Sequence, residues 1–307
     1  MKRLFLLLLG CGVFAASVWG RDVVFAGYNL ENYAPAAASG GDATGKPGKT
    51  EAAAAAVVQV VGEIGPDILG VCEMGPAPQF AEFRQRLDAA GLGYVDAEWV
   101  DAADPTRHLA LVSRFPIVAR QSVADAPYES GGVRMKVRRG FLDVTVEIAP
   151  GCRVRIVGAH LKSRLALPGA GNPDLERRQE AHLLRKHLDE ILAADPAVPL
   201  LVYGDFNDTR EQPAIREILG IRGSPQALTD LRLADAQGDR WTYYWKTDDV
   251  YSRIDFLFVN RALAPWVVAA RSGVYRSPLW NVASDHRPVF ATLHPPSTET
   301  LPASHQP

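Results

Sequence analysis

Six apolar segments of this sequence carry a polar or titratable residue at one end, and this pattern restricts the fold more than any other feature. The clearest example is LLVYGDFND at residues 200–208. Its first four residues are apolar or aromatic and predict a buried strand. Gly204 and then Asp205 follow this strand. Asp205 and Asn207 are two positions apart, so both side chains leave the same face of an extended chain. Alone, this stretch fits either a solvated turn or a cation- or phosphate-binding site, because Gly, Asp and Asn are common in turns.

The same arrangement recurs at five further places. The polar residues at those segment ends are Asn29, Glu73, His160, Asp255 and the triplet Ser284-Asp285-His286. Each has an ordinary structural explanation: a turn, a helix cap, a structural histidine or, for Asp255, an ion pair with Arg253. Unrelated residues would need six separate explanations, whereas convergence on one pocket needs a single cause. We therefore expect these side chains to share one site.

The body of the chain mixes helical stretches with many short strands. Helical periodicity predicts helices over residues 50–64, 77–90 and 174–192, the first of them capped by Thr50. Strands are predicted over residues 23–28, 68–72, 109–113, 116–123, 140–148, 153–160, 200–203, 254–259 and 289–293. Some of these strands follow one another without an intervening helix, which favours an α/β body with mixed sheets over a purely parallel one. No linker or repeat divides residues 21–296, so we expect a single domain.

The N-terminus is typical of a secretory signal peptide, with Lys2 and Arg3 before an apolar run and a cleavage site after Gly20. This predicts a secreted or periplasmic protein; lipid anchoring at Cys11 is an alternative. No later run is long enough to span a membrane, and residues 297–307 resemble a disordered tail. Cleavage removes two of the 33 Lys and Arg side chains and none of the 35 acidic ones, which argues against general affinity for nucleic acid but not against a local basic groove.

A series of motifs places the chain near a known family. YNLEN, PDILGVCE, LALVSRFPI, RRGFLDV, GAHLKS, GDFND, SRIDFLFV and SDHRPV occur in this order. Together they resemble the endonuclease/exonuclease/phosphatase superfamily over roughly residues 22–294. The resemblance implies a four-layer α-β-β-α sandwich of two mixed sheets.

The resemblance also implies a metal site. Glu73 matches the principal ligand of a divalent cation, with Asn29 beside it and Asp285 next to the metal. Mg²⁺ or Mn²⁺ is expected, because both ions prefer hard oxygen ligands. Asp205 and Asn207 match the pair that positions the attacking water and holds a phosphate oxygen.

Two histidines complete the implied site. Asp255 and His286 match an Asp–His pair in which the carboxylate orients the ring and raises its basicity. His160 matches a position that contacts the phosphate or the leaving group. Which residue removes the proton from water stays open.

We therefore expect a secreted, divalent-metal-dependent hydrolase of phosphodiester bonds, most similar to a nuclease and acting as a monomer. The alternatives are a phosphomonoesterase, a phospholipid phosphodiesterase, or a non-catalytic binding relative. The substrate is a phosphate ester, with nucleic acid among the candidates. Candidate substrate contacts are Lys162, Arg139, Trp241 and Tyr243. The aromatic residues either stack on a base or sugar or pack under a loop, and the basic residues either meet phosphates or form a solvated strand edge.

Cys72 and Cys152 are not expected to form a disulfide. Cys72 lies at the site end of its strand, whereas Cys152 begins the strand that ends at His160. Eight extended residues span about 26 Å, and a disulfide needs Cα atoms within about 7 Å.

Overall fold

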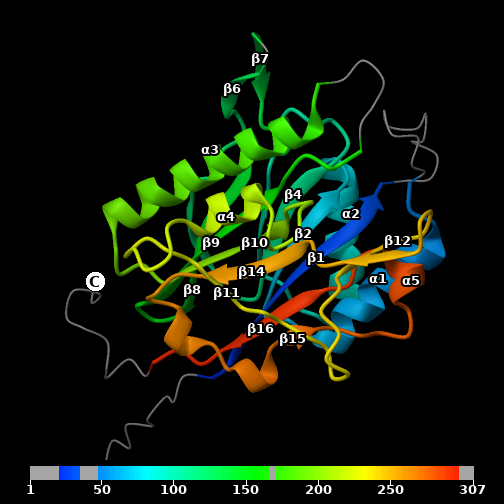
Figure 1. The fold of residues 1–307 in the computed structure, drawn as a ribbon. Helices are drawn as coiled ribbons and strands as arrows, with labels where there is room; N and C mark the ends of the chain where they lie inside the picture. Colours follow the sequence, from blue (N-terminus) through cyan, green and yellow to red (C-terminus); the bar gives the residue numbers. More distant parts are fainter. Residues whose placement is uncertain (1–20, 35–47, 131, 166–170, 297–307) are drawn as a thin grey trace, which may run out of the picture.

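The computed structural model describes residues 21–34, 48–130, 132–165 and 171–296. Two six-stranded mixed sheets pack face to face, and helices cover their outer faces (Figure 1). The expected four-layer α-β-β-α sandwich is therefore confirmed.

The strands of the first sheet are, from one edge to the other, β15 (Gly273–Val274), β16 (Val289–Leu293), β1 (Val23–Tyr33), β2 (Ile68–Met74), β4 (His108–Ser113) and β3 (Asp96–Trp99). Those of the second are β11 (Thr229–Asp230), β14 (Asp255–Val259), β10 (Leu200–Asp205), β9 (Cys152–His160), β8 (Phe141–Ala149) and β5 (Ile117–Arg120). Two separate hairpins pair β6 (Pro127–Ser130) with β7 (Val133–Lys136), and β12 (Tyr243–Trp245) with β13 (Val250–Ser252).

The helices divide between the two outer faces. The first sheet is covered by α1 (Glu51–Ile64) and α2 (Ala77–Ala89), with the short α5 (Trp280–Ala283) against α1. The second sheet is covered by α3 (Pro173–Ala194) and α4 (Pro213–Leu219). Two short 3₁₀ helices are η2 (Ala264–Trp266) and η3 (Ala269–Arg271). Thr50 caps α1 as expected, because its side chain accepts a hydrogen bond from the Ala53 amide.

The central strand β10 is apolar on both faces because each face meets a different core. Leu201 and Tyr203 point into the core between the sheets, while Leu200 and Val202 point into the core beneath α3. This explains why the strand is a continuous apolar run rather than an alternating one.

Strand direction brings the polar segment ends together. β1 and β2 are parallel, and so are β9 and β10, so each pair ends at the same edge; Asp205 lies opposite His160 in this register. β14 runs antiparallel to β10, so its first residue, Asp255, is the one that pairs with Asp205. The site therefore forms at one end of the sandwich.

The ring of Tyr203 fixes how the two sheets approach each other. The side chain is fully buried, and its hydroxyl donates a hydrogen bond to the Ala110 carbonyl at 3.2 Å. A Cβ atom on Gly70 of the first sheet would lie 2.3 Å from this ring, and one on Gly158 of the second sheet 2.5 Å from it. Only glycine leaves room for the ring at these two positions.

Cys72 and Cys152 are free and buried, which confirms that they do not pair with each other. Cys72 Sγ lies 3.9 Å from the carbonyl of Ala159, beside His160, while Cys152 begins the same strand β9 at its other end. The expected signal peptide and C-terminal tail, residues 1–20 and 297–307, lie outside the described residues. Among the described helices, none has the length and apolar character needed to cross a membrane.

We expect Gly70→Ala to lower the free energy of unfolding by about 1–3 kcal/mol, the usual cost of overpacking a core. The matched control is Gly62→Ala on α1, where an added Cβ meets nothing within 4 Å and alanine favours the helix by about 0.5–1 kcal/mol. Guanidinium unfolding of the three proteins measures both effects. Equal stability of Gly70→Ala and wild type would show that the ring does not fill this space.

Candidate functional site

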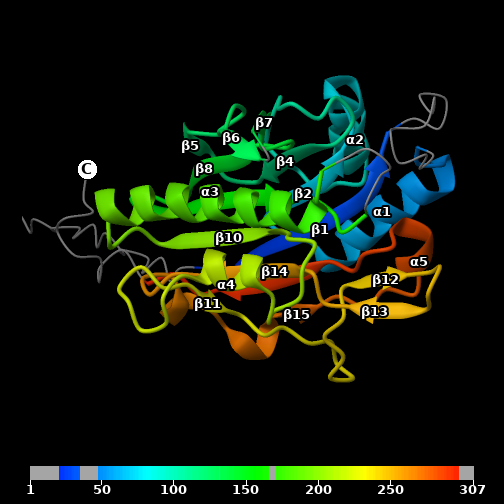
Figure 2. The same ribbon diagram turned by 45° about the horizontal axis from the view of Figure 1, so that its top comes forward.

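A cavity of about 730 Å³ opens at the end of the sandwich where the polar segment ends meet. Figure 2 shows that the β12–β13 hairpin and α5 lie at this same end, next to the carboxyl end of β1. Six of the catalytic and metal-binding residues expected from the sequence line the cavity: Glu73, His160, Asp205, Asn207, Asp285 and His286. Asn29 and Asp255 lie directly behind this wall, bonded to Asp205 and His286, respectively.

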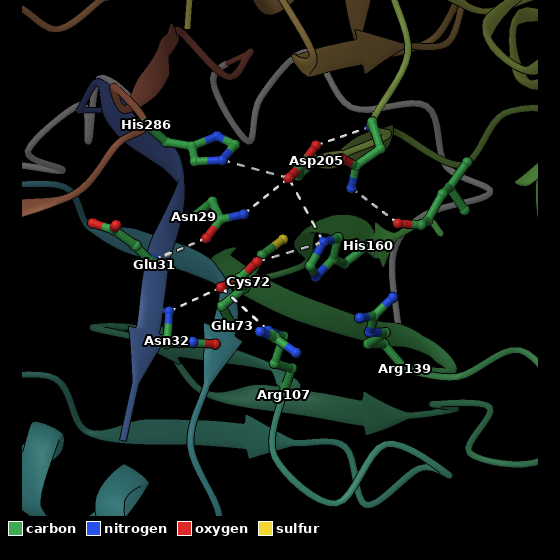
Figure 3. A network of polar contacts seen from close by, with 12 residues as sticks. Asn29, Glu31, Asn32, Cys72, Glu73, Arg107, Arg139, His160, Asp205 and His286 are labelled. Carbon is green, nitrogen blue, oxygen red and sulfur yellow. Dashed lines mark hydrogen bonds and ion pairs between the residues drawn. The ribbon is translucent and has the colours of Figure 1, made fainter. Parts of the chain in front are cut away.

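Asp205 is at the centre of the site and is almost fully buried. Its Oδ2 accepts a hydrogen bond from the side-chain Nδ2 of Asn29 at 2.9 Å, and its Oδ1 accepts one from the backbone amide of Asn207 at 2.9 Å. The same Oδ2 lies 3.6 Å from His160 Nε2 and 3.7 Å from His286 Nε2. One carboxylate therefore lies between two imidazole rings (Figure 3).

Asp255 and His286 form the pair that the sequence predicts. His286 Nδ1 lies 2.8 Å from Asp255 Oδ2, and the Thr242 hydroxyl oxygen accepts a hydrogen bond from the Asp255 amide at 3.0 Å. Arg253 does not take part, because its guanidinium pairs with Asp230. The alternative that Asp255 serves as an ion-pair partner of Arg253 is therefore wrong.

Two pKa values of the site are shifted upward. Burial, followed by the charge of Asp255, raises the pKa of Asp205 to about 7. Burial opposes the charged form of His286, but the carboxylates of Asp255 and Asp205 outweigh it and raise the pKa of that imidazole to about 10. A proton is therefore held on His286 at neutral pH.

Glu73 occupies a strained position at the end of β2. Its φ of 59° is in the left-handed region, which is uncommon for a residue with a side chain and recurs at functional sites. Glu73 Oε2 accepts a hydrogen bond from the Asn32 amide at 2.8 Å and lies 3.4 Å from Arg107 Nε. The N-cap of α2 is Pro76, so Glu73 does not cap that helix.

His160 differs from His286 in its charge. Its Nε2 lies 3.9 Å from Glu73 Oε1, yet burial and the nearby charge of Arg139 lower the pKa of the imidazole well below its usual value. The ring is therefore neutral at physiological pH.

The acidic side chains provide two groups of potential metal ligands. Ligand atoms of Asp205, Asp255 and His286 lie within 4.8 Å of one another and could hold a metal ion. The sequence predicts a different set, Asn29, Glu73 and Asp285, whose hard oxygens also suit a divalent cation. Each set has two members that line the cavity, Glu73 and Asp285 in the predicted set and Asp205 and His286 in the other.

The expected substrate contacts divide into two pairs. Tyr243 and Arg139 line the cavity, and the Tyr243 ring lies 4.6 Å from the ring of His286. Lys162 and Trp241 do not belong to the described cavity wall. Lys162 Nζ instead donates to the carbonyls of Ser163 and Leu165.

The sequence analysis missed several residues of the cavity wall, among them Glu31, Arg107 and Trp280. Glu31 lies within the YNLEN motif, which could have identified it. Arg107 directly precedes β4, which runs antiparallel to β2, so the start of β4 lies at the site end of the sheet. Finding Arg107 required the direction of that strand.

Comparisons with known proteins give one family match and several structural matches. A model of the Endonuclease/Exonuclease/phosphatase family matches residues 27–286. Truncated TDP2 of Caenorhabditis elegans has a similar structure, with 18% identity, coverage of 89% of this chain and 97% of that chain, and a TM-score of 0.60. A search of the curated proteins found no significant match.

Two further solved structures share the fold. The human Nocturnin catalytic domain, solved with bound sulfate anion, has 18% identity, covers 89% of this chain and 94% of that chain, and gives a TM-score of 0.63. An endonuclease/exonuclease/phosphatase from Beutenbergia cavernae has 23% identity, with 90% of this chain and 72% of that chain covered and a TM-score of 0.61. At these identities the matches support the fold.

We expect the imidazole of His286 to remain protonated up to about pH 10 in metal-free protein. Replacing Asp255 by Asn removes the adjacent charge and should lower this pKa by about 2 units or more. Nitrogen-15 NMR of labelled histidine across a pH titration in EDTA measures both values. A wild-type ring that titrates near pH 6.5 would contradict the proposed ion pair.

Proposed function

Because the chain belongs to the endonuclease/exonuclease/phosphatase family, we propose that it is a phosphoesterase that hydrolyses phosphodiester bonds with the help of a divalent cation. Nucleic acids and nucleotides are the favoured substrates. The observation that carries this proposal is the position of Asp205 between His286, held protonated by Asp255, and the neutral His160. Such a site can activate water on one side and stabilise phosphate charge on the other.

The cavity suits a divalent cation because five acidic side chains border it: Glu31, Glu73, Asp205, Asp248 and Asp285. A bound cation offsets their mutual repulsion. We favour Glu73, Asn29 and Asp285 as its ligands and Mg²⁺ or Mn²⁺ as the ion. His286 is the weaker choice, since a ring that bonds Asp255 and carries both protons has no lone pair for a metal. When bound, a cation of this kind neutralises charge on the phosphoryl oxygens.

Four residues of the chain would carry out the remaining steps of hydrolysis. Asp205 is suited to orient the attacking water and take its proton, because its pKa of about 7 is near the operating pH. Asn29 holds the Asp205 carboxylate in place through its amide. The His286 imidazolium donates a hydrogen bond to a phosphate oxygen, and Asp255 keeps the ring charged and oriented.

A phospholipid phosphodiesterase is the second candidate. It is favoured by exposed apolar side chains of the β12–β13 hairpin at the cavity mouth: Val250 is 47% and Tyr251 50% exposed. Such side chains can insert into a lipid surface.

We further propose that residues 21–296 act as one exported, monomeric domain. The support for export is the signal-like sequence of residues 1–20. Retention of a lipid on Cys11 is the alternative.

A substrate panel tests the proposed function. Plasmid DNA, oligonucleotides, inositol phosphates, sphingomyelin and a chromogenic phosphodiester should be assayed with Mg²⁺, with Mn²⁺ and with EDTA. We expect turnover of the nucleic-acid substrates and the chromogenic diester that EDTA abolishes. Full turnover after EDTA treatment and dialysis would exclude the metal requirement, and turnover of sphingomyelin alone would favour the second candidate.

Replacing Glu73 by Gln should raise the metal concentration needed for half-maximal activity by roughly tenfold or more, since losing one anionic ligand costs at least about 1.4 kcal/mol. The control is Glu63→Gln, an exposed glutamate at the end of α1. Activity measured against metal concentration gives both values. If the two variants resemble wild type equally, Glu73 is not a metal ligand.

Asp255 and His286 should behave as one catalytic unit. Asp255→Asn and His286→Ala should each lower kcat by about two orders of magnitude or more, and the double variant should be little worse than the poorer single one. Two outcomes would mean that Asp255 has only a structural role. The effects of the two replacements could be additive, or Asp255→Asn could fold with a lower melting temperature and turn over at the wild-type rate. Turnover and thermal unfolding of all four proteins separate these outcomes.

A further inference from the structure

A lysine side chain is buried near the site, at the junction between β1 and α1. Lys49 directly precedes Thr50, the N-cap of α1, and its backbone amide donates a hydrogen bond to the carbonyl of Ala34, just after β1. Its side chain is only 4% exposed. Lysine is rarely buried to this extent unless it is paired, because a buried ammonium group must be compensated. The contacts of this ammonium group therefore indicate what the residue does.

The ammonium group of Lys49 connects two segments of the candidate site. Its Nζ donates a hydrogen bond to the carbonyl of Ala283 at 2.7 Å and lies 4.0 Å from Glu31 Oε2. Ala283 is the last residue of α5, which packs against α1 (Figure 1). Glu31 belongs to β1 and lines the cavity. One side chain therefore contacts both the end of α5 and the end of β1.

The turn that follows α5 is bonded to the same part of β1. The Ser284 hydroxyl donates a hydrogen bond to the carbonyl of Asn29 at 2.8 Å and accepts one from the backbone amide of His286 at 3.0 Å. The backbone amide of Asp285 donates to Glu31 Oε2 at 3.1 Å, the same oxygen that the lysine approaches. The position of Asp285 at the cavity therefore depends on how this turn meets β1.

We propose that Lys49 is a positioning residue, which holds the turn after α5 against β1 and thereby keeps Asp285 in place as a metal ligand. This inference rests on the proposed function, in which Asp285 is one of the favoured ligands. An ammonium group suits the task because it can donate to a carbonyl and attract a carboxylate at the same time. Lys49 itself does not belong to the described cavity wall.

Two competing explanations make different predictions. If Lys49 only offset the negative charge of the cavity, its loss would strengthen the binding of a cation, because a repulsive charge would be removed. If Lys49 only fixed the start of α1, damage to that helix end would have the same effect as its loss. Thr50→Ala is the matched control for the second explanation, since it removes the capping hydrogen bond from the Ala53 amide and retains the lysine.

The first experiment measures binding of Mn²⁺ by electron paramagnetic resonance, which needs no turnover. Lys49→Met keeps the length of the side chain and should weaken Mn²⁺ binding by roughly tenfold, as expected for the loss of one charge-assisted hydrogen bond. Lys49→Arg keeps the charge and should weaken it less. Thr50→Ala should lower the melting temperature and leave the affinity nearly unchanged. Tighter or unchanged binding by Lys49→Met, or an equal loss in Thr50→Ala, would overturn the proposal.

The second experiment measures amide hydrogen exchange by NMR in EDTA, which needs neither metal nor substrate. In Lys49→Met the amides of Asp285 and His286 should exchange roughly tenfold faster than in wild type, while those of β10 keep their rates. Thr50→Ala should not change the exchange of the turn. Equal acceleration in the turn and in β10 would contradict the positioning role, because the variant would then be destabilised throughout.

The two experiments also separate this inference from the proposed function. A wild-type protein that binds Mn²⁺ but hydrolyses no phosphate ester rejects the proposed function, and the affinities of the variants still decide the role of Lys49. If wild type binds no Mn²⁺, the metal site is rejected, and the exchange rates decide whether Lys49 holds the turn. If Lys49→Met does not fold, Lys49→Arg decides: a smaller loss of the same kind supports the role, and wild-type affinity and exchange overturn it.

Discussion

The ring of Tyr203, buried between the two sheets, is the contact on which the rest of the site depends. It fits only because Gly70 and Gly158 present no side chain to it, and so it sets the separation and register of the sheets. Three residues of the candidate site follow these core positions by two or three residues in the sequence. Asp205 is two residues beyond Tyr203, His160 two beyond Gly158, and Glu73 three beyond Gly70. Because these residues are so near in sequence, the packing of the core around Tyr203 also fixes the distances between the polar side chains at the end of the sheets.

The site also shows how environment divides roles between chemically identical side chains. His160 and His286 both lie within 4 Å of Asp205 and both are buried. The carboxylate of Asp255, which bonds His286 Nδ1, raises the pKa of His286 and keeps this ring charged. Burial and the charge of Arg139 lower the pKa of His160 and keep that ring neutral. Asp205 therefore faces a cation on one side and a neutral ring on the other.

Much of this arrangement could be predicted from the sequence, because long apolar runs and the residues that end them carry strong signals. The main strands, three helices and the meeting of Asp205, Asp255 and His286 were predictable in this way. The short or exposed elements β3, β6, β7, β11–β13 and β15 were not, since a few residues give no reliable periodicity. Arg107 was missed because its place depends on strand direction. The contacts of Lys162 with nearby carbonyls could not be predicted, because they depend on how the chain turns after β9.

The central claim is that these strand ends form a hydrolytic site in which water attacks phosphorus. The most direct measurement is hydrolysis of bis(p-nitrophenyl) phosphate with Mg²⁺ or Mn²⁺ in water enriched in oxygen-18, followed by mass spectrometry of both products. The account predicts one oxygen-18 atom in the p-nitrophenyl phosphate and none in the p-nitrophenol. Absence of any hydrolysis, or oxygen-18 in the p-nitrophenol, would contradict it.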